Sequence, residues 1–278
     1  MPVLFNYDEV EPVTIGNGVK KQALITPERV KNDCILLDRF ILDEMAIMEL
    51  AVSNTDLAWF QLLEGDAVLD GTEGAHDLTV SNVVFLPPGF EGNLSTTKGA
   101  VALFGGVPDA ARFDKNFGES LEFRCINWRA EPALSSVHDE RTRIYLVTPT
   151  LFGTKAVKGE MIIYPPGTTA ALHHHEGAEH FQYIISGSGT AILGDETAPI
   201  RAGDTLYNYE FEKHNFINGD EEDLVFVEYF VPAECSTIWV NPAIVCSWEP
   251  TGMNVDGGDP SRHIDAHTSA ETVNPEGV

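Results

Sequence analysis

The stretch GTTAALHHHEGAEHFQYIISG, residues 167–187, decides the fold. It places three consecutive histidines shortly before an apolar run that ends at a glycine. Side chains alternate between the two faces of an extended strand, so His173 and His175 point one way and His174 the other. Two imidazoles on one face of a strand can bind one transition-metal ion. The stretch therefore predicts a β structure that holds a metal.

The chain outside this stretch consists mostly of short β-branched or aromatic runs. These runs are separated by turn-forming residues, and the 278-residue chain contains 24 glycines and 16 prolines. Closely spaced strands with little helical periodicity between them indicate an all-β sandwich or barrel. The one helix that the sequence favours lies around Asp109 to Lys115.

An internal repeat makes this interpretation more specific. In WFQLLEGDAVLDG the first strand ends at Gly65, and SNVVFLPPGFEG begins sixteen positions later at Ser81. In HFQYIISGSGTAILGD the strand ends at Gly187, and GDTLYNYEFEKH begins sixteen positions later at Gly203. Both pairs of landmarks are related by an offset of 122 residues. A fixed offset indicates a duplicated β unit, and the alternative is two unrelated segments with coincident spacing.

The two copies diverge upstream of these landmarks. The run EMAI at 44–47 resembles EMII at 160–163 at an offset of 116, so the first copy is expected to lack six residues. This missing stretch corresponds to the histidine-bearing loop of the second copy. The first copy also has Gly92 where the second has His214. We therefore expect a first unit without metal, whose role is in packing, in pairing of domains or in shaping the pocket.

The two motifs of the second copy resemble the cupin superfamily. Its first motif is a glycine, five residues, HxH, three or four residues, a glutamate, six residues and a glycine, and Gly167 and Gly187 fit its ends. The second motif fits at Gly203, His214 and Asn218, but has YEF at 209–211 where the family has PxG. The resemblance implies an all-β, duplicated double-stranded β-helix with two jelly-roll barrels in one chain.

The resemblance also implies domain limits. The expected organisation is given by five segments: an N-terminal arm (1–34), a degenerate metal-free cupin (35–108), a linker (109–150), a metal-binding cupin (151–246) and a polar C-terminal tail (247–278).

The same motifs imply the metal ligands His173, His175, His180 and His214. The third ligand is ambiguous, because counting six residues back from Gly187 selects His180, whereas counting three residues forward from His175 selects Glu179. We favour His180, since the turn usually fixes the register of a strand. Glu179 then becomes a pocket carboxylate that orients an imidazole or acts as a base, and Gln182 is a second inward-facing candidate for the catalytic site.

A metal held by neutral imidazoles keeps its full positive charge and favours an anionic, oxygen-rich chelating substrate. The cluster alone does not choose the metal. Our leading hypothesis is an Fe(II) dioxygenase, as the resemblance to cupin dioxygenases implies, acting on an enol, a diketone or a hydroxylated aromatic. Mn, Zn and Ni are the alternative metals.

Two other function classes stay open. One is a Mn- or Zn-dependent hydrolase, isomerase or lyase, in which the metal polarises a carbonyl or activates water. The two-barrel organisation is similar to the ureidoglycine aminohydrolases, although that family is expected to have Glu and Gln where this chain has His173 and His214. The other class is a non-catalytic protein that binds a small ligand.

The charge balance restricts the partners of the chain. Its 43 acidic and 17 basic residues give a net charge of −26. Nucleic acids and anionic membrane surfaces need a basic footprint, so we expect neither as a partner. No window approaches the roughly 18 apolar residues of a spanning helix, which predicts a cytoplasmic protein. We expect a homodimer through strand exchange by the N-terminal arm, and interpret the acidic balance as an adaptation to a salt-rich medium.

Overall fold

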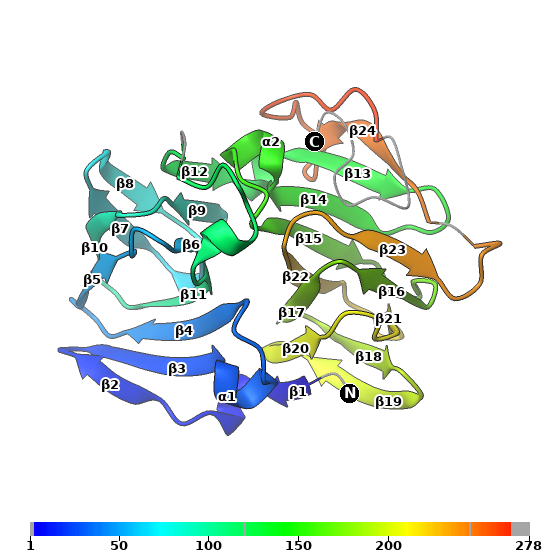
Figure 1. Cartoon of the computed structure of the whole chain (residues 1–278), viewed down its shortest axis with the longest axis horizontal. Coiled ribbons are helices and arrows are strands. Elements are labelled where there is room, and N and C mark those ends of the chain that lie inside the picture. The colour runs from blue at the N-terminus through cyan, green and yellow to red at the C-terminus, as the bar shows by residue number, and fades with distance from the viewer. Residues whose placement is uncertain (1–2, 119–120, 245, 268–278) are drawn as a thin grey trace. The chain divides into compact units, whose positions relative to one another are not determined.

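The computed structural model describes residues 3–118, 121–244 and 246–267, and strands dominate it (Figure 1). The α-helices of these residues are two single turns, α1 (Pro27–Val30) and α2 (Pro149–Phe152). The helix expected near Asp109 is a 3-10 turn, Ala110–Arg112. None of the described helices is long or apolar enough to cross a membrane. The expected all-β fold is confirmed.

The chain divides into two compact units, each with two antiparallel sheets. The unit Tyr7–Trp128 is called the first barrel here, and the unit of Met1–Asn6 with Arg129–Val278 the second barrel. The strands of the first barrel are β2 (Val13–Gly16), β3 (Val19–Ile25), β4 (Leu36–Leu42), β5 (Ile47–Ala51), β6 (Leu57–Gly65), β7 (Ala67–Gly71), β8 (Gly74–Leu78), β9 (Asn82–Leu86), β10 (Glu91–Ser95), β11 (Ala100–Val107) and β12 (Arg124–Asn127).

The second barrel has a larger sheet, ordered β1-β20-β17-β22-β15-β14-β13-β24, and a smaller one, ordered β19-β18-β21-β16-β23. Its strands are β1 (Val3–Asn6), β13 (Pro132–Ser136), β14 (Thr142–Val147), β15 (Lys158–Tyr164), β16 (His173–Glu176), β17 (Glu179–Ser186), β18 (Ser188–Leu193), β19 (Glu196–Arg201), β20 (Asp204–Asn208), β21 (His214–Ile217), β22 (Leu224–Val231), β23 (Ser236–Trp239) and β24 (Trp248–Asn254).

Alternating side chains from the two sheets fill the interior of each barrel. In the first barrel Phe60 and Phe104 stack with ring centroids 4.5 Å apart. In the second barrel Phe216 and Phe226 meet at 4.9 Å. Burying one such side chain contributes roughly 1.5–3 kcal/mol, so these interiors hold the strands that carry the polar residues described below.

The strand registers show that the two barrels are copies of one plan. In the first barrel Phe60 pairs with Phe104, which pairs with Asp38. In the second barrel Gln182 pairs with Glu228, which pairs with Glu160. Each triplet lies across three neighbouring strands, which are β6, β11 and β4 in the first barrel and β17, β22 and β15 in the second. Residues of the two barrels can therefore be equated one by one.

These registers correct the expected match of EMAI at 44–47 with EMII at 160–163. Glu160 lies within β15, whose equivalent is β4, whereas Met45 lies in the turn before β5 and has a φ of 61°. The six-residue deletion inferred from that match is therefore wrong. Short runs with similar residues can be aligned at the wrong offset, and the pairing of residues between strands gives the correct one.

Strands also occupy segments that the sequence analysis assigned to a linker and a tail. Residues 109–150 contain β12, β13 and β14, and β24 pairs with β13 beyond residue 246. The N-terminal strand β1 pairs with β20 of its own chain, and Asn6 donates a hydrogen bond to Asp204 over 2.7 Å. The strands β1, β13, β14 and β24 extend the larger sheet of the second barrel, with β1 and β24 at its two edges, whereas β12 pairs with β9 at an edge of the first barrel.

Candidate metal centre

Four buried side chains meet inside the second barrel: His175, His180, His214 and Glu228. One ligand atom from each lies within 4.8 Å of the others. They come from the four strands β16, β17, β21 and β22, so both sheets contribute to the cluster. Three imidazoles and one carboxylate suit divalent Mn, Fe, Co, Ni or Zn.

The hydrogen bonds of the imidazoles leave ring nitrogens available for a metal. His214 donates its Nδ1–H to the carbonyl oxygen of Glu212 over 3.0 Å, which directs its Nε2 lone pair into the cluster. The Nδ1 of His175 lies 3.2 Å from the Thr237 hydroxyl. The Nε2 atoms of His180 and His214 are 3.2 Å apart. Two nitrogens bound at right angles about 2.1 Å from one ion would be about 3 Å apart, so this spacing fits a shared metal.

The electrostatic setting keeps these imidazoles neutral. Burial holds the pKa of His175 and His180 well below the ordinary value, and neighbouring imidazoles lower both further. Burial also lowers the pKa of His214 to about 4. Neutral imidazole is the form that binds a metal, so these three histidines are in their metal-binding form at neutral pH.

Of the four predicted ligands, His173 lies at the edge of the cluster. Its ring centroid is 4.5 Å from that of His214 and 5.0 Å from that of His175. It donates Nδ1–H to the carbonyl of Ala171 over 2.9 Å, so its Nε2 is also available. His174 lies on the opposite face, 3.2 Å from the Glu176 carboxylate. The alternation expected for the three consecutive histidines is present.

Of the two candidates for the ambiguous third position, His180 belongs to the cluster and has no exposed surface. Glu179 is half-buried at the start of β17 and is not among the clustered residues. The physical reason is strand alternation, because adjacent residues of β17 face opposite sides of the sheet.

Glu228 is the member of the cluster that the sequence analysis missed. It is the only charged residue in the apolar strand LVFVEYFV, and that isolated charge is the signal that could have found it. The expected ligand set of neutral imidazoles therefore lacks a carboxylate that the structure places there. Burial, and then Glu160, raise the pKa of Glu228 to about 8.

Gln182, a predicted catalytic residue, contacts Glu228 rather than the cavity. Its side-chain amide donates a hydrogen bond to the Glu228 carboxylate. It accepts another from Asn208 over 2.7 Å, and both amides are fully buried. This chain of hydrogen bonds fixes the orientation of the Glu228 carboxylate, which is a positioning role.

A small cavity of about 50 Å³ adjoins the cluster. At roughly 10–15 Å³ for each water-sized group, it has room for only a few such groups. Its lining includes His175, His214 and Glu228 from the cluster, the neighbouring His173, the cations Arg141, Arg143 and Lys158, and the rings of Trp239 and Trp248.

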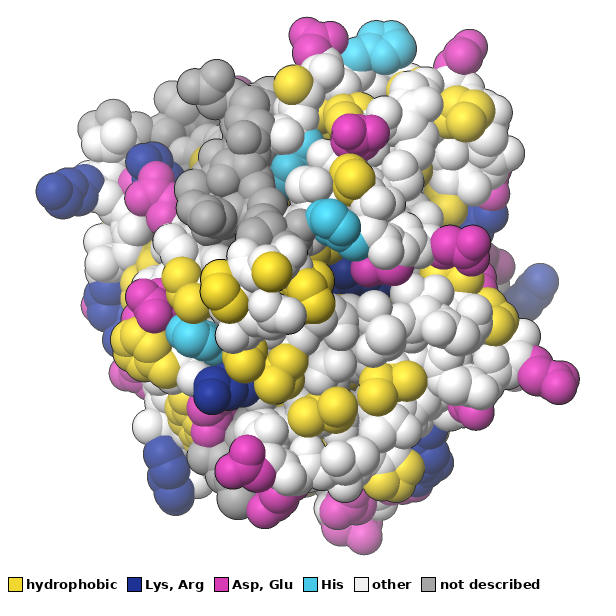
Figure 2. Space-filling model, turned by 90° about the vertical axis from the view of Figure 1, so that its right-hand side faces the viewer, with side chains coloured by type: hydrophobic (Ala, Val, Ile, Leu, Met, Phe, Trp, Pro, Cys, Tyr) yellow, Lys and Arg dark blue, Asp and Glu magenta, His cyan; other side chains and the backbone are white. Residues whose placement is uncertain are grey.

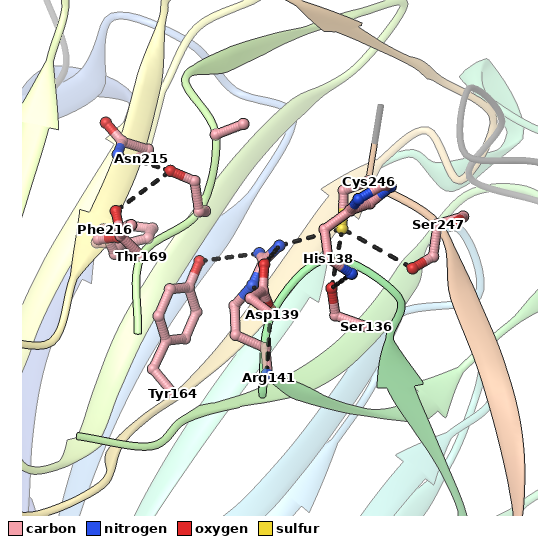
Figure 3. Close-up of polar contacts among 12 residues, drawn as sticks. Ser136, His138, Asp139, Arg141, Tyr164, Thr169, Asn215, Phe216, Cys246 and Ser247 are labelled. Atoms are coloured by element: carbon pink, nitrogen blue, oxygen red, sulfur yellow. Dashed lines mark hydrogen bonds and ion pairs between the residues drawn. The ribbon is translucent and has the colours of Figure 1, made fainter. Parts of the chain in front are cut away.

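The cations of this cavity form two groups. Arg143 and Lys158 share Glu160, at 3.1 and 2.9 Å, so this group carries one excess positive charge. Arg141 is paired with Asp139 at 2.8 Å and donates to the Tyr164 hydroxyl over 3.2 Å (Figure 3). A buried cation without an anionic partner is costly, and each of these cations has a carboxylate partner.

These cations supplement a metal as binding partners for an anionic ligand. Most acidic residues of the chain lie outside the cavity, whose lining includes two guanidinium groups and one ammonium group. In the view of Figure 2, a basic and an acidic side chain are visible at the bottom of a hollow that is flanked by hydrophobic side chains. The site can therefore combine a metal with charge-assisted hydrogen bonds to carboxylate oxygens.

Comparison with known proteins agrees with this arrangement. Residues 160–230 match the Cupin domain family. An oxalate-binding protein of Thermotoga maritima is 34% identical over 67 residues, which are 24% of this chain and 55% of that protein. Polyketide synthase CurC of Streptomyces cyaneus is 34% identical over 93 residues, 33% of this chain and 58% of that protein. The chain spans only 50–60% of the length of the curated relatives it matches.

Solved structures of oxalate decarboxylase from Bacillus subtilis show the same fold. One superposes with a TM-score of 0.67 at 17% identity, over 86% of this chain and 78% of its own. Another, described for its Mn(II) centres, has a TM-score of 0.67 at 18% identity, over 86% and 79%. Residues 160–230 are therefore similar to a cupin domain, and the chain shares the two-barrel fold of these structures.

Proposed function

We propose that the second barrel is a manganese-dependent lyase site for a small dicarboxylate. The observation that carries the proposal is the buried His175, His180, His214 and Glu228 cluster beside a cavity with an excess of cations. His173 is close enough to complete the coordination from the edge of the cluster. Manganese is supported by the donor set and by the Mn(II) centres of a structural neighbour.

Different residues of the site have different roles in binding. A bound divalent metal supplies a Lewis acid that polarises a ligand oxygen. Arg143 presents a planar fork that can hold a carboxylate through two parallel hydrogen bonds. Glu160 holds that guanidinium in place at 3.1 Å, and Gln182 orients the Glu228 carboxylate. The rings of Trp239 and Trp248 narrow the space beside them and help to exclude water.

The proposed substrate is oxalate or a dicarboxylate of similar size. Its support is the small volume of the cavity, the cations in its lining, and the names of two kinds of relative, an oxalate-binding protein and oxalate decarboxylases. The proposed reaction breaks the bond between the two carboxylate carbons of the substrate. It releases CO2, and a proton takes the place of that CO2 on the remaining carbon.

This proposal replaces the Fe(II) dioxygenase as the leading hypothesis. That hypothesis depended on a carboxylate-poor ligand set, and the structure places Glu228 in the cluster. The structural neighbours named above are oxalate decarboxylases, and one of them is described for its Mn(II) centres. A site that binds a dicarboxylate without converting it remains the second candidate, because one curated relative is described as an oxalate-binding protein.

The test uses the purified full chain loaded with manganese. Oxalate is added, its binding is measured by calorimetry, and CO2 and formate are quantified. We expect saturable binding and equal amounts of the two products. Binding without products would identify a binding protein, and no binding at all would contradict the proposal for both functions. Arg143→Met, with its metal content checked, is the matched variant and should lose oxalate binding.

A further inference from the structure

The first barrel has a cavity at the position where the second barrel has its candidate metal centre. This cavity has a volume of about 400 Å³. Its lining includes Leu50, Val52, Ala58 and Phe104. All lining residues lie between positions 15 and 108, so the cavity belongs to the first barrel alone.

The strand registers equate these four residues with the metal-site residues. Leu50 pairs with Gly92 as His173 pairs with His214. Gly89 donates its backbone N–H to the carbonyl of Val52, as Phe211 does to that of His175. Ala58 pairs with Gly106 as His180 pairs with Phe230, and Phe104 occupies the place of Glu228. The donor set has been replaced by apolar side chains while the cavity is kept.

The larger volume of the first cavity follows from three smaller or shorter side chains. Gly106 stands where the second barrel has Phe230, Ala58 where it has His180, and Leu36 where it has Lys158. The cavities measure about 400 and about 50 Å³. A volume of 400 Å³ lies in the range of pockets that hold small organic molecules, roughly 300–1,000 Å³.

One polar feature is retained in the first cavity. Lys21 and Asp38 form an ion pair of 2.6 Å, at the positions of Arg143 and Glu160. Both side chains are partly accessible, at 36% and 21%. The pair offers a ligand both a donor and an acceptor. The other charged lining residues, Glu49 and Asp56, are acidic, so the cavity does not favour an anion.

We infer that the first barrel binds an uncharged aromatic molecule that carries one hydroxyl or carbonyl group. Its ring lies against Phe40 and Phe104, whose own rings meet edge to face with centroids 5.0 Å apart. Its polar group hydrogen-bonds to the Lys21–Asp38 pair. Several apolar side chains that line this cavity, among them Leu50 and Phe104, are only partly buried, and such concave apolar surface usually marks a ligand site. The inference is independent of the function proposed for the second barrel.

The experiment uses 2-naphthol as the probe and the full chain loaded with manganese. We expect one molecule of 2-naphthol to bind per chain in calorimetry, and 2-naphthoate, its anionic counterpart, to bind at least about tenfold more weakly. Asp38→Asn should weaken 2-naphthol binding several-fold, because a neutral amide oxygen replaces the charged carboxylate, which is the stronger acceptor.

Substitutions that fill the cavity test the location of the bound probe. A Cβ added at Gly106 meets the Leu57 carbonyl oxygen at 3.5 Å and Leu36 Cβ at 4.0 Å, which is ordinary contact. Gly106→Leu should therefore fold and reduce 2-naphthol affinity at least about tenfold, whereas the control Gly106→Ala should change it less than about threefold. Ala58→Leu fills the same space from β6 and should act like Gly106→Leu. Unchanged manganese content reports an intact second barrel.

Three results would overturn the inference. One is no binding of 2-naphthol to the native chain. Another is full binding by both Gly106→Leu and Ala58→Leu, which would place the probe elsewhere. The third is a native dimer that Gly106→Leu converts to a monomer, since the cavity would then be a surface for a second copy of the chain.

Discussion

The two barrels share one strand plan but differ in what fills their interiors. At equivalent positions the second barrel has His180, Glu228 and Arg143, and the first has Ala58, Phe104 and Lys21. The pairing of the strands that carry these residues is the same in both barrels. The difference shows that the fold depends on apolar alternation and turns, whereas the chemistry depends on a few inward-facing residues that can be exchanged independently.

The largest effect is expected from His180→Ala, which gives the second barrel the residue of the first. His180 is fully buried between the other members of the cluster. Losing one imidazole from a small donor set should lower manganese affinity by at least about a hundredfold. Metal analysis after dialysis measures this loss. His174→Ala is the control and should keep the metal, because His174 faces away; equal losses in both variants would refute the assignment of faces.

A smaller effect is expected from Gln182→Leu. The substitution removes the hydrogen bond that orients Glu228 but leaves every proposed ligand in place. Manganese affinity should fall by roughly 10–100-fold, as for other residues that support metal ligands. A metal titration followed by electron paramagnetic resonance measures it. Leu should be accommodated, since Phe60 occupies the equivalent position in the first barrel; an unchanged affinity would remove the positioning role.

Arg143→Lys transfers the cation of the first barrel into the second. Lysine keeps the charge beside Glu160 but lacks the planar fork that holds a carboxylate. We expect oxalate affinity to fall about tenfold, which is about 1.4 kcal/mol, with manganese content unchanged. Calorimetry with oxalate and metal analysis separate the two quantities. Native affinity in this variant would show that charge alone, and not guanidinium geometry, holds the ligand.

The smallest effect concerns a turn. Phe211 has a φ of 69°, and the equivalent Gly89 has a φ of 75°. A bulky side chain in the left-handed region costs roughly 1–2 kcal/mol, which glycine avoids. Phe211 is 58% exposed, so Phe211→Gly should lose little packing and raise the free energy of unfolding by about 1 kcal/mol. Thermal unfolding measures it against Phe211→Ala, which keeps the strain; a lower stability of the glycine variant would show that packing dominates.

Much of the fold was predictable because alternation and turn residues are local signals. The offset of 122 residues identified the duplication, and the registers of β6 and β17 bear it out through Phe60 and Gln182. The strands β13, β14 and β24 were missed, since short strands carry weak periodicity, and β24 is held by pairing with β13 far along the chain.

The site was predictable only where its residues form a motif. His175, His180 and His214 occur at recognisable spacings, and the structure brings them together. Glu228 and the cations Arg143 and Lys158 lie on strands whose sequences show no spacing rule. They reach the same cavity because β14, β15 and β22 are neighbours in the sheet, which is a property of long-range pairing.

The most direct test of the account is the metal content of the native full chain after purification with manganese and removal of loosely bound ions. We expect one manganese per chain, and none in His180→Ala, because the described residues of the first barrel contain no cluster of metal donors. Two metals per chain would contradict the loss of the site from the first barrel. A native chain without metal, or a His180→Ala variant that retains it, would contradict the site proposed in the second.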